Sequence, residues 1–78
     1  AIYVAIVKTA EDERSCEYSF GPTGNQTGRA KIDKRSGVVL VLCEVAGDEK
    51  LTYSPRAAKK LSLHWKEGTF PDRTCWVS

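Results

Sequence analysis

His64 is the only histidine of the chain, and its side chain is the one best suited to proton transfer near neutral pH. It could act as a general acid or base, or bind a metal ion. No serine or cysteine stands in a recognisable nucleophile motif, and no partner for the ring can be named. The alternative is a boundary residue near a helix C-terminus, where a partial positive charge is favourable. We therefore expect no catalytic residue, and a small enzyme with His64 in a pocket is the second alternative function.

Three cysteines could join His64 as ligands of a zinc ion: Cys16, Cys43 and Cys75. Structural zinc sites bring their ligands in close pairs, whereas the gaps here are 27, 21 and 11 residues. We expect no metal site and interpret the cysteines as small buried hydrophobic residues. Their odd number and unequal spacing also argue against a disulfide framework and favour a reducing compartment. The sequence thus predicts a cytoplasmic location.

The segment 21–28 contains Gly21, Gly24 and Gly28, which suggests a phosphate-binding loop. Such a loop ends in Gly-Lys-Ser/Thr and leads into a helix, but Gly28 leads into a predicted strand. We interpret the segment as a connector and expect no cofactor.

Four basic residues follow the predicted helix on the side away from its apolar stripe: Arg56, Lys59, Lys60 and Lys66. Basic side chains on one face could contact phosphates, and nucleic-acid binding of this kind depends steeply on salt. The net charge is only +2, and acidic residues are interleaved in the same half of the chain. A nucleic-acid-binding regulator is therefore kept as the alternative function.

These residues must be positioned by a single domain spanning residues 1–78. Apolar or alternating segments predict strands over residues 2–8, 15–20, 29–32 and 37–45. In the second of these strands, Cys16, Tyr18 and Phe20 are expected on one face. Ser54 and Pro55 are typical of a helix start, and the helix should run to residue 66 or 67, before Gly68. The fold class is α+β: a mostly antiparallel sheet of about four strands, one C-terminal helix and an ordered aromatic tail.

The segment 33–37 predicts a hairpin turn between the third and fourth strands. Asp33 can open the turn through its side chain, and Gly37 can take the left-handed conformation. In this hairpin we expect Ile32 to lie near Val38, and Ala30 near Leu40.

The strand over residues 37–45 is apolar on both faces, and residues 2–7 repeat this pattern. One helix covers only one face of a sheet, so the other face needs a second copy of the chain or another protein. The expected pairing assigns Val39, Val41 and Val45 to this interface, with Leu63 and Trp76 as secondary candidates. The function predicted first is therefore a non-enzymatic protein-protein interaction module, most simply a homodimer. No apolar run approaches the length of a membrane span, so we expect no membrane partner.

Four segments, 18–24, 32–38, 56–61 and 65–71, together resemble a group of short, uncharacterised bacterial proteins carried as orphan genes or on mobile cassettes. The resemblance covers most of the chain. It implies a bacterial cytoplasmic protein, but no activity and no site residue.

Overall fold

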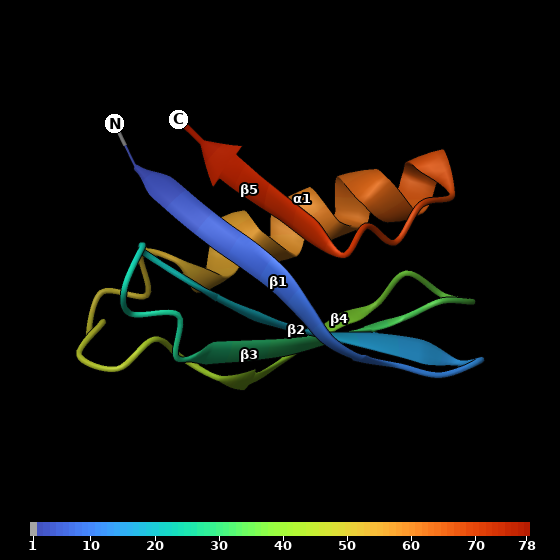
Figure 1. Cartoon of the computed structure of the whole chain (residues 1–78), viewed down its shortest axis with the longest axis horizontal. Coiled ribbons are helices and arrows are strands. Elements are labelled where there is room, and N and C mark those ends of the chain that lie inside the picture. Colours follow the sequence, from blue (N-terminus) through green and yellow to red (C-terminus); the bar gives the residue numbers. More distant parts are fainter. Residues whose placement is uncertain (1) are drawn as a thin grey trace.

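The computed structural model describes residues 2–78 and joins all strands into one antiparallel sheet (Figure 1). The strands are β1 (Tyr3–Glu11), β2 (Ser15–Gly21), β3 (Gly28–Asp33), β4 (Val39–Cys43) and β5 (Arg73–Val77), and the helix α1 (Ser54–Glu67) precedes β5. The sheet order is β4-β3-β2-β1-β5, so the first four strands form a meander and β5 returns to pair with β1. The predicted α+β fold with an antiparallel sheet and one helix is confirmed, but the sheet has five strands, not four.

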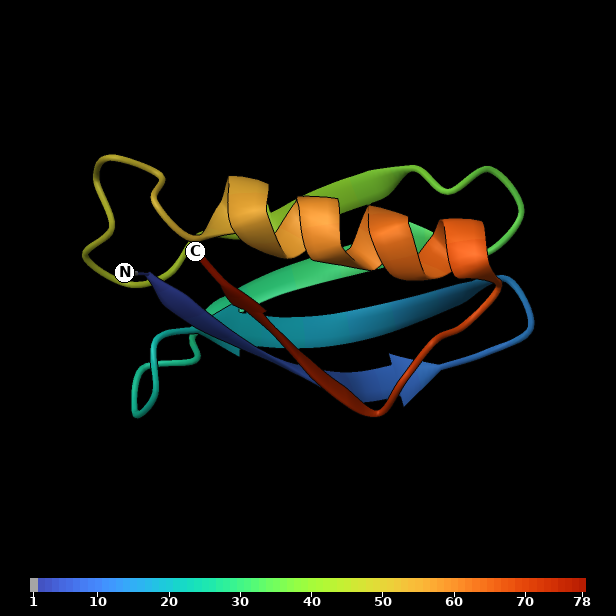
Figure 2. The ribbon, with the colours of Figure 1, turned by 90° about the horizontal axis from the view of Figure 1, so that it is seen from above.

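The core lies between α1 and one face of the sheet. Figure 2 shows α1 in the trough of the twisted sheet, with β4 on one side of it and β5 on the other. Tyr18, Phe20 and Cys16 alternate along β2 and point into this core, as the sequence predicted. Ala57 and Leu61 of α1 meet them from the opposite side. Each strand therefore contributes every second side chain to the core and directs the others away from α1.

The C-terminal end of α1 follows the predicted signal, but at its start Tyr53 and not Ser54 is the N-cap residue, and no side chain caps the helix. Pro55 lies in the first turn, where its missing N–H costs no helical hydrogen bond. Gly68 ends the helix with a left-handed φ of 78°, and its N–H donates to the carbonyl of Trp65 at 2.9 Å. The chain can therefore turn back sharply toward β5.

The turn between β3 and β4 forms as predicted, but the expected pairing of the two strands is wrong by one residue. Oδ1 of Asp33 accepts hydrogen bonds from the backbone N–H groups of Arg35 and Ser36, and Gly37 has a φ of 77°. The backbone N–H of Asp33 also donates to the carbonyl of Val38 at 2.9 Å, so Asp33 belongs to the strand as well as to the turn.

This extra pair shortens the turn and shifts the register. Ile32 pairs with Val39 and Ala30 pairs with Val41. Because side chains alternate between the faces, a shift of one residue moves every side chain of β4 to the other face from the one expected.

Trp65 attaches this hairpin to the helix. Its Nε1 donates a hydrogen bond to the carbonyl of Lys34 at 2.8 Å. Its ring lies so close to Gly37 that a Cβ atom there would stand 2.6 Å from the ring. Gly37 is thus required twice, for its left-handed backbone and for the approach of Trp65.

The substitution Gly37→Ala separates these two requirements when it is compared with Gly24→Ala. Both glycines have positive φ, but a Cβ at Gly24 would meet nothing within 4 Å. We expect Gly24→Ala to lower the free energy of unfolding by about 1 kcal/mol through backbone strain alone. Gly37→Ala should cost about 1–3 kcal/mol more, because the methyl group overpacks against Trp65. Urea denaturation of both variants measures the difference, and equal losses would contradict the role of the Trp65 contact.

Candidate functional site

The candidate site is the sheet face opposite α1, which we call the open face. Since Val4, Ile6, Ala30 and Ile32 point into the core, their strand neighbours point outward. Five of the seven exposed large hydrophobic side chains of the described chain lie on this face, each between 47% and 65% exposed. They are Tyr3, Val38, Leu40, Leu42 and Val77. The open face therefore carries more uncovered apolar surface than α1 does.

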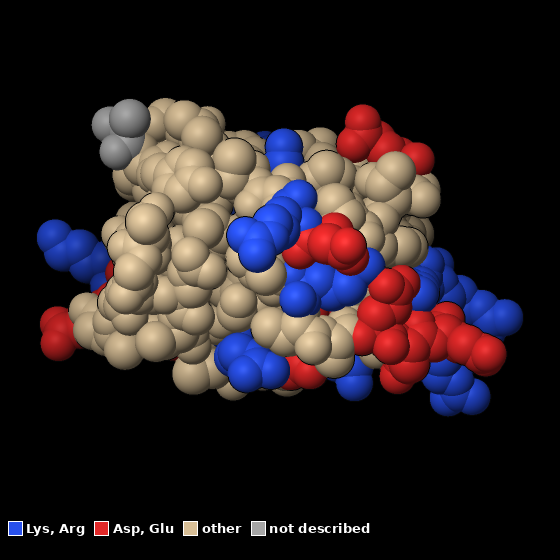
Figure 3. All heavy atoms as spheres, viewed as in Figure 1, with Lys and Arg blue, Asp and Glu red and all other residues tan. Residues whose placement is uncertain are grey.

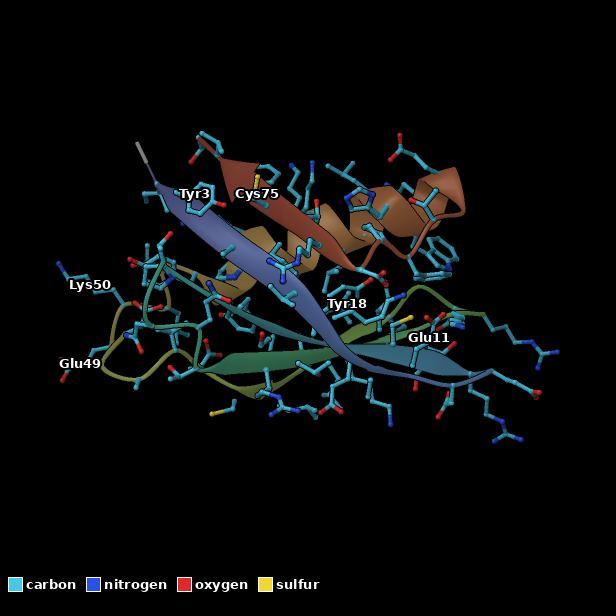
Figure 4. All side chains as sticks on the ribbon, viewed as in Figure 1. Tyr3, Glu11, Tyr18, Glu49, Lys50 and Cys75 are labelled. Carbon is cyan, nitrogen blue, oxygen red and sulfur yellow. The ribbon has the colours of Figure 1, made fainter. Side chains whose placement is uncertain are left out.

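These residues form two apolar strips along opposite margins of the open face. The β5 strip consists of Tyr3, Cys75 and Val77 around Ala5, which is itself only 9% exposed; Ala5 pairs with Cys75, and Tyr3 pairs with Val77. Figure 4 shows Tyr3 and Cys75 close together on the same side of β1 and β5. Figure 3 shows an area almost without charged side chains over the beginning of β1 and the end of β5. The β4 strip consists of Val38, Leu40 and Leu42.

Charged residues separate the two strips. Arg29 lies 3.4 Å from the carboxylate of Glu17, and Lys31 pairs with Leu40 across β3 and β4. Arg73 begins β5 and lines a hollow of about 430 Å³ beside Tyr3 and Gln26. Each strip, taken alone, is an apolar area with charged residues beside it, as in the apolar centre and polar rim of a protein interface.

The structure places three of the predicted interface residues on the covered side of the sheet. Val39 and Val41 are partly buried against the core, and Val45 is only 3% exposed. The assignment of Val39 and Val41 to the uncovered face is therefore wrong, because the register is shifted by one residue; Val45 lies beyond the end of β4 and is buried in the core. Leu40 and Leu42 take the outward positions of β4.

The two secondary candidates differ. Trp76 packs against the core from the α1 side of β5. Leu63 is 41% exposed on the outer face of α1, as the helix pattern predicted.

His64 connects α1 to β5. Its Nε2 lies 2.9 Å from Oγ1 of Thr74, and its Nδ1 lies 3.2 Å from Oγ1 of Thr69. The Thr69 hydroxyl also contacts the His64 carbonyl at 3.3 Å. If it donates there, Nδ1 carries the ring proton and Nε2 accepts from Thr74. Both ring nitrogens have partners within the fold, which fits a structural role.

The three cysteines do not come together at one site. Cys16 is buried in the core, Cys75 is half-buried on the open face and Cys43 is exposed at the end of β4. Within residues 2–78, no three histidine, cysteine or acidic side chains are grouped so that they could hold a metal ion.

The densest group of ionisable side chains joins β1 to the β3–β4 turn. Nζ of Lys8 lies 2.6 Å from Oε1 of Glu11, and Nζ of Lys34 lies 2.7 Å from Oε2. Lys8 also lies 3.3 Å from Asp72, and Lys34 lies over the ring of Phe70. This ion cluster crosses the end of the core, next to Tyr18, whose hydroxyl donates to the Pro71 carbonyl at 2.8 Å.

The electrostatics of this cluster do not suit acid-base catalysis. The ammonium groups of Lys34 and Lys8 lower the pKa of Glu11 to about 2, so its carboxyl group has no proton to donate at neutral pH. The hydrogen bond to Glu11 raises the pKa of Lys8, which keeps that amine protonated. Burial raises the pKa of Tyr18 to about 12. A general acid or base needs a pKa near the working pH, whereas these shifts move all three pKa values further from neutrality.

The basic residues of α1 do not all project freely. Arg56 is half-buried and donates a hydrogen bond from Nη1 to the Thr52 carbonyl at 2.7 Å. Lys60 is also half-buried, whereas Lys59 and Lys66 are exposed with Leu63 between them on the helix surface.

Glu11→Gln should reduce the acid sensitivity of the fold. The folded-state pKa of Glu11 lies below its ordinary value of 4.5, so its charge stabilises the fold above that value. This contribution is lost as the pH falls from about 4.5 toward 2. We expect the variant to melt below the wild type at pH 7 and the two melting temperatures to converge toward pH 2.

The control is Glu49→Gln, in the exposed loop after β4, where no ion pair is formed with any described residue (Figure 4). Its melting temperature should follow the wild type at every pH. A constant difference between Glu11→Gln and the wild type from pH 7 to pH 2 would contradict the assignment of Glu11.

The part of the chain that the structure describes contains no helix long and apolar enough to cross a membrane. Compared with protein-family models, curated proteins and solved structures, the chain matches none of them.

Proposed function

We propose that this protein is a non-enzymatic protein-protein interaction module that self-associates through the open face of its sheet. The observation that carries the proposal is the concentration of exposed apolar side chains in the β5 and β4 strips. The three free cysteines suit a reducing compartment such as the cytoplasm, where the thiols stay unpaired.

The exposed apolar surface is large relative to the stability of a small domain. Burial of one Val, Leu or comparable side chain contributes roughly 1.5–3 kcal/mol relative to exposure. A domain as a whole is stable by only about 5–15 kcal/mol. The free energy gained by covering several residues of the open face is therefore large compared with the stability of a domain of 78 residues.

The two alternatives have less support. A nucleic-acid regulator would use the basic face of α1, but Arg56 donates to the Thr52 carbonyl and Leu63 interrupts the exposed lysines. An enzyme would use His64, but Thr69 and Thr74 already occupy both ring nitrogens.

A double variant, Leu40→Lys with Val77→Lys, tests the proposal because it places one charge in each apolar strip. We expect the wild type to show a mass of two chains by light scattering coupled to gel filtration. The double variant should show the mass of one chain at the same concentrations, since burial of an uncompensated charge opposes association.

The control is Leu51→Lys with Leu63→Lys, which adds the same charge at exposed leucines outside the open face. This variant should remain associated. A wild type that is monomeric across a dilution series would refute the proposal, as would equal effects of the two double variants.

A further inference from the structure

β5 forms one edge of the sheet, and the backbone N–H and C=O groups of three of its five residues point away from β1. The Ile2 N–H donates to the Ser78 carbonyl at 2.9 Å, and the Lys8 N–H donates to the Asp72 carbonyl at 2.8 Å. In an antiparallel pair the residues that bond to the neighbouring strand alternate. Hence Thr74 and Trp76 bond to β1, and the N–H and C=O groups of Arg73, Cys75 and Val77 point away from it. Within residues 2–78 no hydrogen-bond partner is found for these groups.

The two edges of the sheet differ in their protection. β4 pairs with β3 through a register shift beside Arg29. Such a bulge bends the edge strand and makes it less able to pair with a strand of another chain. β5 has a regular register, with no bulge and no proline, and Arg73 is its only charged residue. Figure 1 shows no strand along its outer side. A regular, mostly uncharged edge is the kind that pairs with another strand.

We propose that two copies of this chain pair through β5, antiparallel about a two-fold axis at Cys75, so that their sheets become one continuous sheet. The inference rests on the proposed self-association but joins the copies along the β5 edge, so that the two open faces form one continuous surface and are not stacked on each other. Because Cys75 and Val77 belong to the β5 strip, the pairing also brings the β5 strips of the two copies together on the open face.

The positions of the unpaired backbone N–H and C=O groups favour a second copy of this chain as the partner and determine the register of the pairing. Arg73, Cys75 and Val77 are evenly spaced about Cys75, so β5 is complementary to itself. With Cys75 opposite the partner's Cys75, Arg73 faces the partner's Val77, and the free N–H and C=O groups of all three residues are paired. A shift by two residues toward the helix would bring Pro71 into the ladder, which has no N–H to donate. No like charges stand directly opposite each other in the selected register.

Charge substitutions at Val77 test this pairing. Val77→Glu would place a carboxylate opposite Arg73 of the other copy at two symmetric positions, and Val77→Arg would place two cations there. We expect Val77→Glu to tighten the dimer by about two- to thirtyfold and Val77→Arg to weaken it by a similar factor. Sedimentation equilibrium in low salt measures both dissociation constants. If the open faces instead stacked on each other, both substitutions would weaken the dimer.

Thiol cross-linking provides a second, independent readout. Opposed residues of a hydrogen-bonded pair have Cα atoms about 5.5 Å apart, within reach of a short bismaleimide. Cys16 is buried, so the variant Cys43→Ser leaves Cys75 as the accessible thiol. Cys43→Ser should give a covalent dimer and Cys75→Ser should not.

The outcomes separate the two proposals. A dimer that cross-links through Cys75 and shows opposite effects of the two Val77 variants supports the pairing of β5. A dimer that lacks either property overturns the pairing of β5 and leaves self-association through the open face standing. A wild type that stays monomeric overturns both.

Discussion

The constraint on which this structure depends is that one helix of 14 residues has to cover a sheet of five strands. The sheet satisfies it by twisting around α1, so that both edge strands contact the helix and the core is enclosed from three sides. The same solution leaves most of the outer surface of the sheet uncovered by the described residues, although Thr23 and Gln26 lie beside Ala5 there, and Ala5 is only 9% exposed. The core is buried on one face and the apolar strips are exposed on the other for the same reason, namely that a single helix can cover only one face of the sheet.

Local signals in the sequence were sufficient for the elements but not for their alignment. The alternation of Cys16, Tyr18 and Phe20, and the stop at Gly68, depend on neighbours within a few residues, and both were predicted correctly. The face of β4 depends on whether Asp33 closes the strand or opens the turn, and it does both. A strand that is apolar at every position gives no pattern from which to detect a shift of one residue.

The candidate site was therefore predictable as a kind of surface but not as a set of residues. The existence of an uncovered sheet face was predictable, because the sequence offers one helix for a sheet of several strands. On β4 the sequence assigned the inward-facing residues to this face in place of the outward-facing ones. The residues on β5 were missed, because residues 73–77 form a strand only by pairing with β1 at the other end of the chain. Thr74, Trp76 and Val77 have side chains that favour strands, and this was the signal available in the sequence.

The position of β1 between β2 and β5 has a consequence for the order of folding. The meander of β1 to β4 needs only contacts between neighbouring segments, so it can form early at a small entropic cost. The pairing of Tyr3 with Val77 closes a loop that includes nearly all of the described chain. Until β5 is added, β1 itself is an edge strand, and its segment Tyr3 to Val7 is apolar at every position. The last strand therefore moves the open edge of the growing sheet from β1 to β5.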